Sequence, residues 1–326
     1  MRITQIIDRK NNSKSNNHIL KPKKNRQSFK SLIKNNWQLY LLLLPLLVYF
    51  FVFCYMPMYG VQIAFRDYKI TKGFWGSEWV GLKYFKQFFN AYYFGRLLSN
   101  TLLLNINGLI WSFPFPLILA ICLNQIRSEK AKRIIQTTIY VPFFISTIVL
   151  AGMLYSFLSP TSGIAGHIMR AFGAKPVDLM SQASAFRPIY IISGIWQGAG
   201  YSSILYIACL SGVDPTLYEA AEIDGASIWR KIWHIDIPSL IPTAVMCFIL
   251  DSGRILSDNT SKALALQTAG NVSKSDVLGV YVYNMGLNSG QFSYTAAIGL
   301  FTNIVNFILI LAVNKISTKV SKTGLF

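Results

Sequence analysis

The sequence predicts an all-α membrane protein with about six transmembrane helices. Of its 326 residues, 52% are hydrophobic and only 13% are charged, whereas a soluble domain carries about 25% charged residues. Several apolar stretches are long enough to cross roughly 30 Å of hydrocarbon. They lie at about 38–58, 98–124, 134–158, 188–210, 239–257 and 296–315.

Prolines inside these stretches indicate bends in the predicted helices. Pro45 lies in the first stretch, Pro114 and Pro116 lie in the second, and Pro142 lies in the third. A transmembrane helix tolerates proline where neighbouring groups satisfy the freed backbone carbonyl. We therefore expect these stretches to cross the membrane with local distortions.

The chain divides into a polar tail and a membrane domain. Residues 1–37 are rich in Lys, Arg, Asn and Ser and are predicted to be a basic tail without stable structure. Residues 38–326 form the predicted membrane domain. Its longer connections lie at 59–97, 159–187 and 258–295.

The positions of Lys and Arg predict the orientation. Of the 31 basic residues, nineteen lie in the tail, in 125–133, in the 211–238 loop and at the C-terminus, while eleven lie in the three longer connections. Cytoplasmic segments carry an excess of Lys and Arg. Both termini and the 211–238 loop are therefore predicted to be cytoplasmic, in a multi-pass protein of the plasma membrane.

The same distribution explains the net charge of +18. No basic stripe with interleaved aromatic residues occurs outside the tail, so we expect no nucleic-acid partner. The four cysteines and three histidines show no metal-ligand spacing. No G-x4-G-K-[ST] motif and no Ser/His/Asp set occurs, so we predict no metal site, no catalytic residue and no enzymatic activity in this chain.

The 211–238 loop carries the most informative pattern, "YEAAEIDGASIWRKIWHIDIP" from Tyr218 to Pro238. Asp214 followed by proline predicts the start of a helix, and Gly225 predicts its end. Ser227 can cap a second short helix, in which isoleucines and tryptophans recur at helical spacing. Pro238 is expected to break the chain before the fifth span. The loop is thus predicted to be helix, glycine elbow and helix.

This loop reproduces the EAA motif, EAA-x3-G-x9-I-x-L-P, with Ile for Leu at position 237. The pattern resembles the signature of permease subunits of binding-protein-dependent ABC importers in bacteria. The resemblance implies the type I importer permease fold, with coupling helices between helices 4 and 5 that dock on an ATPase subunit. The residues implied in this coupling are Glu219, Ala220, Ala221, Asp224, Gly225, Ala226, Ile235 and Pro238.

The resemblance also implies a set of partners. A second homologous permease would complete a heterodimer, and two ATPase subunits would bind ATP and Mg. An extracellular sugar-binding protein, expected to be a lipoprotein, would deliver the substrate. The chain itself is expected to bind no cofactor.

Other segments resemble the oligosaccharide and polysaccharide permeases, including aldouronate-, alginate- and glycan-transporting systems. This resemblance is carried by "VPFFIST" and "TAAIGLFTNIVN", while "PMYGVQIAFRDY" and "WVGLKYFKQFF" resemble the first external segment of sugar-type permeases. The expected function is therefore translocation of an oligosaccharide. Permeases for peptides, amino acids and metals carry the same loop, so a non-sugar solute is an alternative. A membrane enzyme or sensor is the alternative from another class.

Polar and aromatic residues within the spans are candidates for a sugar pathway, because sugars stack on aromatic rings and accept or donate hydrogen bonds. Asp251 and Arg254 could instead form an i,i+3 ion pair that satisfies itself, and the aromatic residues could serve in packing or in the membrane-interface belt. Asn303 and Asn306 are expected to form interhelical hydrogen bonds. The pathway candidates are Asn105, Asn107, Trp111, Trp196, Gln197, Tyr201, Asp251 and Arg254.

Overall fold

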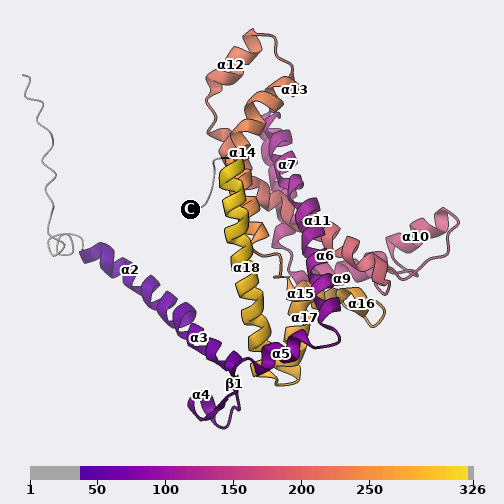
Figure 1. Ribbon diagram of the computed structural model, residues 1–326. Helices are drawn as coiled ribbons and strands as arrows, with labels where there is room; N and C mark the ends of the chain where they lie inside the picture. Colours follow the sequence, from indigo (N-terminus) through magenta and orange to yellow (C-terminus); the bar gives the residue numbers. More distant parts are fainter. Residues whose placement is uncertain (1–36, 258, 322–326) are drawn as a thin grey trace, which may run out of the picture. The chain divides into compact units, whose positions relative to one another are not determined.

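The computed structural model describes residues 37–257 and 259–321 (Figure 1). The predicted basic tail lies outside the described residues except for Trp37, which begins the first helix. The chain forms two compact units, of which one ends at Gly60 and the other begins at Val61. The predicted membrane domain, 38–326, extends over both units.

The described part of the first unit is helical and apolar. It contains α2 (Trp37–Phe50), the π-helical turn η1 (Phe51–Tyr55), α3 (Met56–Met58) and the start of the 3-10 helix η2 (Tyr59–Phe65). No side chain between Trp37 and Phe50 is buried. A helix that is apolar on every face and unburied is suited to lipid.

In the described ranges, four helices are long and apolar enough to cross a membrane: Trp37–Phe65, Phe94–Asn124, Ile228–Ser252 and Phe292–Lys319. A fifth is added if one bent pair counts as a single span. These results confirm an all-α membrane protein. They differ from the expected six spans at the third and fourth positions.

The third expected span is sharply bent. Helices α8 (Glu129–Tyr140) and η3 (Val141–Phe144) meet α9 (Thr147–Leu158) at 97°. Pro142 lies in the first turn of η3 and has no N–H to donate. Ser146 is extended, and its hydroxyl accepts a bond of 3.3 Å from the Val149 N–H, which starts a new helix in another direction.

The fourth expected span lies inside α11 (Ala183–Ser211), which has 29 residues but is not among the four apolar helices. Its buried residues include Ser193 and Ser203, whose hydroxyls donate to carbonyls of their own helix. Gly200 allows close packing, because a Cβ there would lie 2.0 Å from the Ile139 carbonyl oxygen of α8. This helix is therefore packed within protein on one side.

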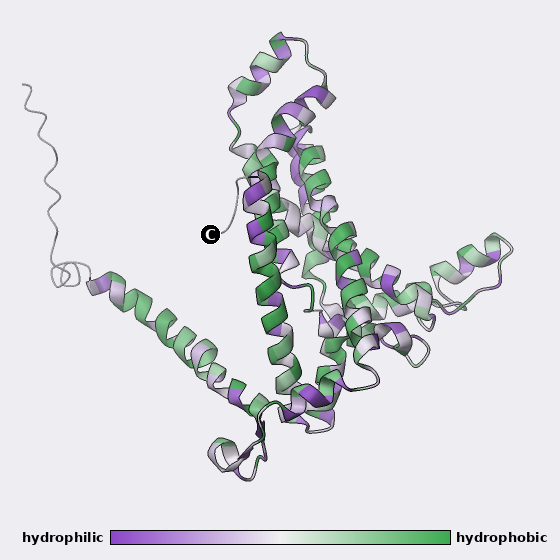
Figure 2. Cartoon of the chain, viewed as in Figure 1, coloured by the Kyte–Doolittle hydropathy of each residue, from purple (hydrophilic) through white to green (hydrophobic). Residues whose placement is uncertain are grey.

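The remaining long helices are α6 (Phe94–Ser112), α7 (Pro114–Asn124), α14 (Ile237–Ser252) and α18 (Phe292–Ser321). Helices α14 and α18 are predominantly hydrophobic along their length (Figure 2). Asn306 of α18 is buried, accepts from the Leu256 N–H at 3.0 Å and donates to the Ser257 hydroxyl at 2.9 Å. Asn306 thus forms hydrogen bonds, but to the turn that follows α14 and not to another helix as predicted, whereas Asn303 is exposed.

Short elements fill the predicted connections. The first connection contains a two-residue antiparallel pair, β1 (Arg66–Asp67) with β2 (Glu78–Trp79), which is a small exception to the all-α prediction. The other elements are α4 (Gly73–Gly76), α5 (Lys83–Phe89), α10 (Ile164–Ala171), α15 (Thr260–Leu266), α16 (Val272–Ser275), α17 (Leu278–Tyr283) and the π-turn η5 (Asn284–Asn288).

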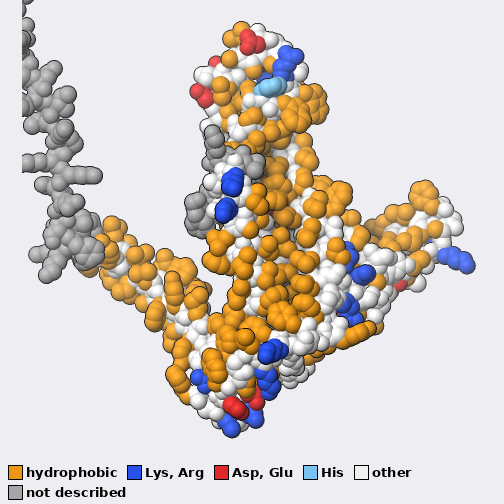
Figure 3. Space-filling view, viewed as in Figure 1, with side chains coloured by type: hydrophobic (Ala, Val, Ile, Leu, Met, Phe, Trp, Pro, Cys, Tyr) orange, Lys and Arg blue, Asp and Glu red, His pale blue; other side chains and the backbone are white. Residues whose placement is uncertain are grey.

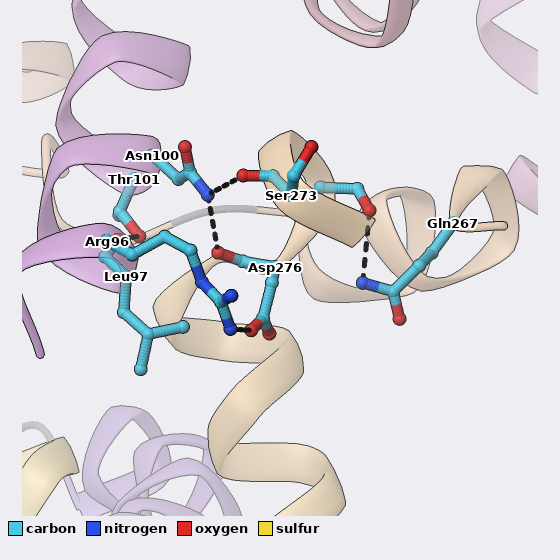
Figure 4. A network of polar contacts seen from close by, with 8 residues as sticks. Arg96, Leu97, Asn100, Thr101, Gln267, Ser273 and Asp276 are labelled. Carbon is cyan, nitrogen blue, oxygen red and sulfur yellow. Dashed lines mark hydrogen bonds and ion pairs between the residues drawn. The ribbon is translucent and has the colours of Figure 1, made fainter. Parts of the chain in front are cut away.

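A polar network attaches the 267–278 segment to α6 (Figure 4). Arg96 and Asp276 form an ion pair of 3.0 Å. The Asn100 amide donates to the carbonyls of Ser273 and Asp276 at 2.9 and 3.1 Å, and the Thr101 hydroxyl accepts from the Leu278 N–H at 2.9 Å. Asn100 and Thr101 are buried, so these bonds fix the position of the segment.

Candidate functional site

The first helix of the 211–238 loop forms as the sequence predicts. Helix α12 (Pro215–Ile223) begins at Asp214, whose carboxylate accepts from the Thr216 N–H at 3.0 Å and whose pKa is lowered by that bond. At the other end Gly225 has a φ of +68°. The Gly225 N–H donates to the Glu222 carbonyl at 3.0 Å and the Ala226 N–H to the Ala221 carbonyl at 2.8 Å, which is a Schellman ending.

The second helix, α13 (Ile228–Lys231), is capped by the Ser227 hydroxyl, as predicted. The prediction that Pro238 breaks the chain is wrong. Helical structure continues through the π-turn η4 (Ile232–Asp236) into α14, and Pro238 lies in the first turn of α14. In the π-turn the Ile237 N–H donates to the Ile232 carbonyl, five residues back. The wider turn accommodates a proline that lacks its own N–H.

An ion pair closes the elbow between the two short helices. Lys231 Nζ lies 2.8 Å from Glu222 Oε1, and this bond lowers the pKa of Glu222. The side chain of Glu222 is 61% exposed, so the pair contributes little free energy of folding on its own. It nevertheless limits how far α12 can turn away from α13.

The loop presents its motif residues to solvent. Glu219, Ala220, Asp224 and Gly225 are exposed, and Pro238 is exposed as well. Figure 3 shows acidic, basic and histidine side chains gathered at the tip that α12 and α13 form. A depression of about 290 Å³ is lined by Ala221, Asp224, Ala226, Arg230, Lys231, His234 and Ile235.

A second candidate site is a cavity of about 740 Å³ among α6, α7, α11, α14 and the residues that follow α14. Its lining includes four of the predicted pathway residues, Asn105, Tyr201, Asp251 and Arg254. The Tyr201 ring stacks on Phe143, with centroids 3.8 Å apart and planes inclined by 5°. Phe143 thus covers one face of the Tyr201 ring and fixes the position of that ring.

Asp251 and Arg254 do not form the ion pair that was the alternative interpretation. Both side chains are exposed and line the cavity. Within the ranges that the structure describes, the ion pairs are Arg96–Asp276 and Lys231–Glu222. Only backbone atoms join the two residues, by a bond of 3.0 Å from the Arg254 N–H to the Asp251 carbonyl.

The other four pathway candidates lie outside the lining of the cavity. An α-helix turns by about 100° per residue. Asn107 and Trp111 are therefore about 160° and 120° away from Asn105 around α6. The Asn107 amide donates to the Leu103 carbonyl of its own helix at 2.6 Å.

On α11, Trp196 is about 140° away from Tyr201 around the helix axis and is 48% exposed. Gln197 shares the face of Tyr201, but its amide donates to the Ile145 carbonyl at 2.7 Å and supports the bend after η3. Ser112, Ser202 and Tyr206 line the cavity and were not among the candidates. Ser202 directly follows Tyr201 and Ser112 is the last residue of α6, and these positions were the available signal, whereas Tyr206 had none.

Comparisons with known proteins identify the family of this chain. A family model described as "Binding-protein-dependent transport system inner membrane component" matches residues 112–322. The chain is 41% identical over 299 residues to Protein LplB of Bacillus subtilis (strain 168), covering 92% of this chain and 94% of the relative. It is 38% identical to the polygalacturonan/rhamnogalacturonan transport system permease protein YteP of the same strain, covering 94% and 96%.

A solved structure is similar as well. The crystal structure of a bacterial ABC transporter involved in the import of the acidic polysaccharide alginate matches with a TM-score of 0.82 and 34% identity, covering 90% of this chain and 99% of that chain. The family match spans more than half of the sequence, and both relatives are matched over nearly their full length. The chain therefore belongs to the family of binding-protein-dependent transport system inner membrane components and is an ABC transporter permease.

Proposed function

We propose that this permease carries acidic oligosaccharides across the membrane as part of an ATP-driven importer. The observation that carries the proposal is the likeness, which covers 90% of this chain, to the structure of a bacterial ABC transporter involved in the import of the acidic polysaccharide alginate. The name of a relative that is 38% identical refers to polygalacturonan and rhamnogalacturonan. Both names point to sugars that contain carboxylates.

The cavity offers groups that suit such a substrate. The Arg254 guanidinium can bind a uronate carboxylate through two parallel hydrogen bonds. The Asp251 carboxylate, one turn away, can accept from sugar hydroxyls and would repel a carboxylate placed beside it. A charged sugar would therefore fit in one register along the cavity, with its carboxylate at Arg254.

A neutral oligosaccharide is the second candidate. The arabinooligosaccharides transport system permease protein AraP of Bacillus subtilis (strain 168) is 31% identical and covers 86% of this chain. An aspartate and an arginine that both line the cavity give it no net charge, which suits neutral sugars too.

The 211–238 loop is proposed to couple transport to ATP hydrolysis. Exposed Ala220 and the small Ala221 let α12 lie deep in a groove of an ATPase subunit, and Glu219 can pair with a basic residue across that interface. The ATPase subunits would bind ATP and Mg. A second permease and an extracellular sugar-binding protein would complete the importer, with residues 38–326 acting as the permease domain.

Uptake of a galacturonate trisaccharide tests the proposed substrate. A deletion strain complemented with this gene and its partner genes is expected to accumulate the labelled trisaccharide, and to take up a neutral arabinose trisaccharide at least about tenfold more slowly, because only the former carries a carboxylate for Arg254. Equal uptake of both sugars, or uptake of the neutral sugar alone, would contradict the acidic assignment.

The proposed orientation places the C-terminus and the 211–238 loop in the cytoplasm. In a variant without the native cysteines, Lys72→Cys is expected to react with an impermeant maleimide in whole cells, since it lies in the first external connection. Thr216→Cys is expected to react only after the membrane is opened. Both residues are exposed in this chain, and reaction of Thr216→Cys once the membrane is opened shows that the membrane alone had protected it. The opposite pattern would reverse the orientation.

A further inference from the structure

Helix α12 is attached to the membrane part of the protein through polar contacts. None of its own residues is buried. The apolar cluster at this end of the unit consists of Ala120, Tyr206, Leu210 and Leu240, which belong to α7, α11 and α14. Apolar packing therefore holds those three helices together but does not include α12.

A buried carboxylate lies at the centre of this attachment, and the Asn124 amide also donates to the Tyr218 hydroxyl at 3.4 Å. Asp236, in the π-turn η4, is fully buried. It accepts from the Tyr218 hydroxyl of α12 at 2.6 Å, from the Gln125 amide at 2.8 Å and from the Asn124 amide at 3.3 Å. Asn124 is the last residue of α7, and Gln125 caps that helix. One side chain thus joins α12, the end of α7 and the start of α14.

The donors around this carboxylate are neutral. Among the described residues, the ion pairs involve other carboxylates, those of Asp276 and Glu222. Burial, together with the bond to Asp236, raises the pKa of Tyr218 to about 12, so its hydroxyl keeps its proton and remains a donor. A buried carboxylate held only by directional bonds is sensitive to the loss of any one of them.

We infer that Asp236 and Tyr218 are positioning residues that make α12 and α7 move as one body when the ATPase moves α12. This role rests on the proposed coupling function. Motion delivered to α12 would reach α7 through the Tyr218–Asp236–Gln125 chain of hydrogen bonds, and α7 lines the transport cavity. Without that chain, α12 would turn about its elbow while α7 stayed in place.

The test uses the assembled complex with its partner subunits in liposomes, and Tyr218→Phe as the main variant. That change removes one hydroxyl and keeps the Gln125–Asp236 bond. Ser239→Ala is the matched control, because it also removes a hydroxyl three residues from Asp236, yet that hydroxyl donates at 2.7 Å to the Ile235 carbonyl, four residues back in the same continuous helical segment. Asp236→Asn keeps an acceptor oxygen and should restore part of the function that Asp236→Leu loses.

Two readouts separate positioning from simple instability. Spin labels at Thr216→Cys on α12 and Ile118→Cys on α7, without the native cysteines, report the distance between the helices in nucleotide-free and vanadate-trapped complexes. We expect the same distance distribution in both states for the wild type and Ser239→Ala, and a shift between states for Tyr218→Phe. The second readout is ATP hydrolysed per galacturonate trisaccharide transported, expected to rise about tenfold in Tyr218→Phe only.

The inference would be overturned if Tyr218→Phe showed the same label distance in both nucleotide states and the same ratio of ATP hydrolysed to sugar transported as the wild type. Effects of equal size in Ser239→Ala would overturn it as well. The label measurement needs no sugar, so failure of the wild type to transport the trisaccharide would count against the proposed substrate alone. A loss of assembly in Asp236→Leu would leave the Tyr218→Phe result decisive, because that variant keeps the buried carboxylate and two of its donors.

Discussion

Replacing Glu219 by lysine is expected to lower sugar-stimulated ATP hydrolysis by the assembled importer about tenfold or more, while the permease still reaches the membrane. Glu219 is exposed near the middle of α12, where the proposed ATPase contact lies. A lysine there would face a basic partner residue, and like charges across an interface cost several kcal/mol, of which about 1.4 kcal/mol is already a tenfold loss. The measurement is ATPase activity of purified complex with and without loaded binding protein.

Glu129→Lys is the matched control for this charge reversal. Glu129 is exposed in the first turn of α8 and, in the proposed orientation, also faces the cytoplasm. The complex that carries Glu129→Lys should retain sugar-stimulated ATP hydrolysis. Loss of stimulation in both variants would point to net charge and not to the docking of α12.

Substitutions at Gly225 distinguish two roles of this residue, which are to adopt a left-handed backbone conformation and to lie in contact with the ATPase. Its φ of +68° is unfavourable for most side chains, although a Cβ there would meet no atom within 4 Å. Valine should therefore disturb the elbow, whereas asparagine, which tolerates this conformation, should disturb it less. If asparagine abolishes stimulation as fully as valine, the position itself is covered by the ATPase.

Replacing Arg254 by alanine is expected to lower uptake of an acidic oligosaccharide about tenfold to a hundredfold, with assembly and basal ATP hydrolysis preserved. A hydrogen bond to a charged group contributes about 1.5–3 kcal/mol, which corresponds to that range of rates. Arg254 lines the cavity and forms no ion pair with Asp251, so its removal should not leave a buried charge unpaired. Uptake rate and melting temperature are measured together.

Arg254→Lys and Asp251→Asn complete the experiment. Lysine keeps the charge but not the planar fork, so it should restore uptake only in part. Asp251→Asn should not impair uptake of an acidic sugar, since it removes a like charge. The structural alternative predicts a lower melting temperature in Arg254→Ala. If the double change Asp251→Asn with Arg254→Gln restores both the melting temperature and the uptake rate, the two residues act structurally.

The sequence was most informative where short-range chemistry decides structure. Asp214 before a proline, Gly225 and Ser227 determine helix ends within a few residues, and each was found as predicted. The prediction failed at Pro238, because a proline preceded by a π-turn continues a helix instead of ending it. Sequence pattern alone does not distinguish these outcomes.

The pathway candidates were harder to choose because nearly every position of a membrane helix is apolar. The direction in which a residue points then depends on its neighbours, which hydropathy does not reveal. Asn105 and Asn107 looked equivalent in sequence, yet about 160° separates them around α6 and only Asn105 lines the cavity. Likewise, Pro142 indicated a bend, but the angle of 97° depends on Ser146 starting a new helix.

The π-turn before α14 also determines the rotational phase of the cytoplasmic loop. The π-turn contains one residue more than a turn of α-helix. Each residue of an α-helix turns the chain by about 100° around the axis. Deleting one residue between Ile232 and Asp236 would thus rotate α13 and the elbow by about a quarter turn around the axis of α14. The direction in which α13 and the elbow point is therefore set by the number of residues in this turn.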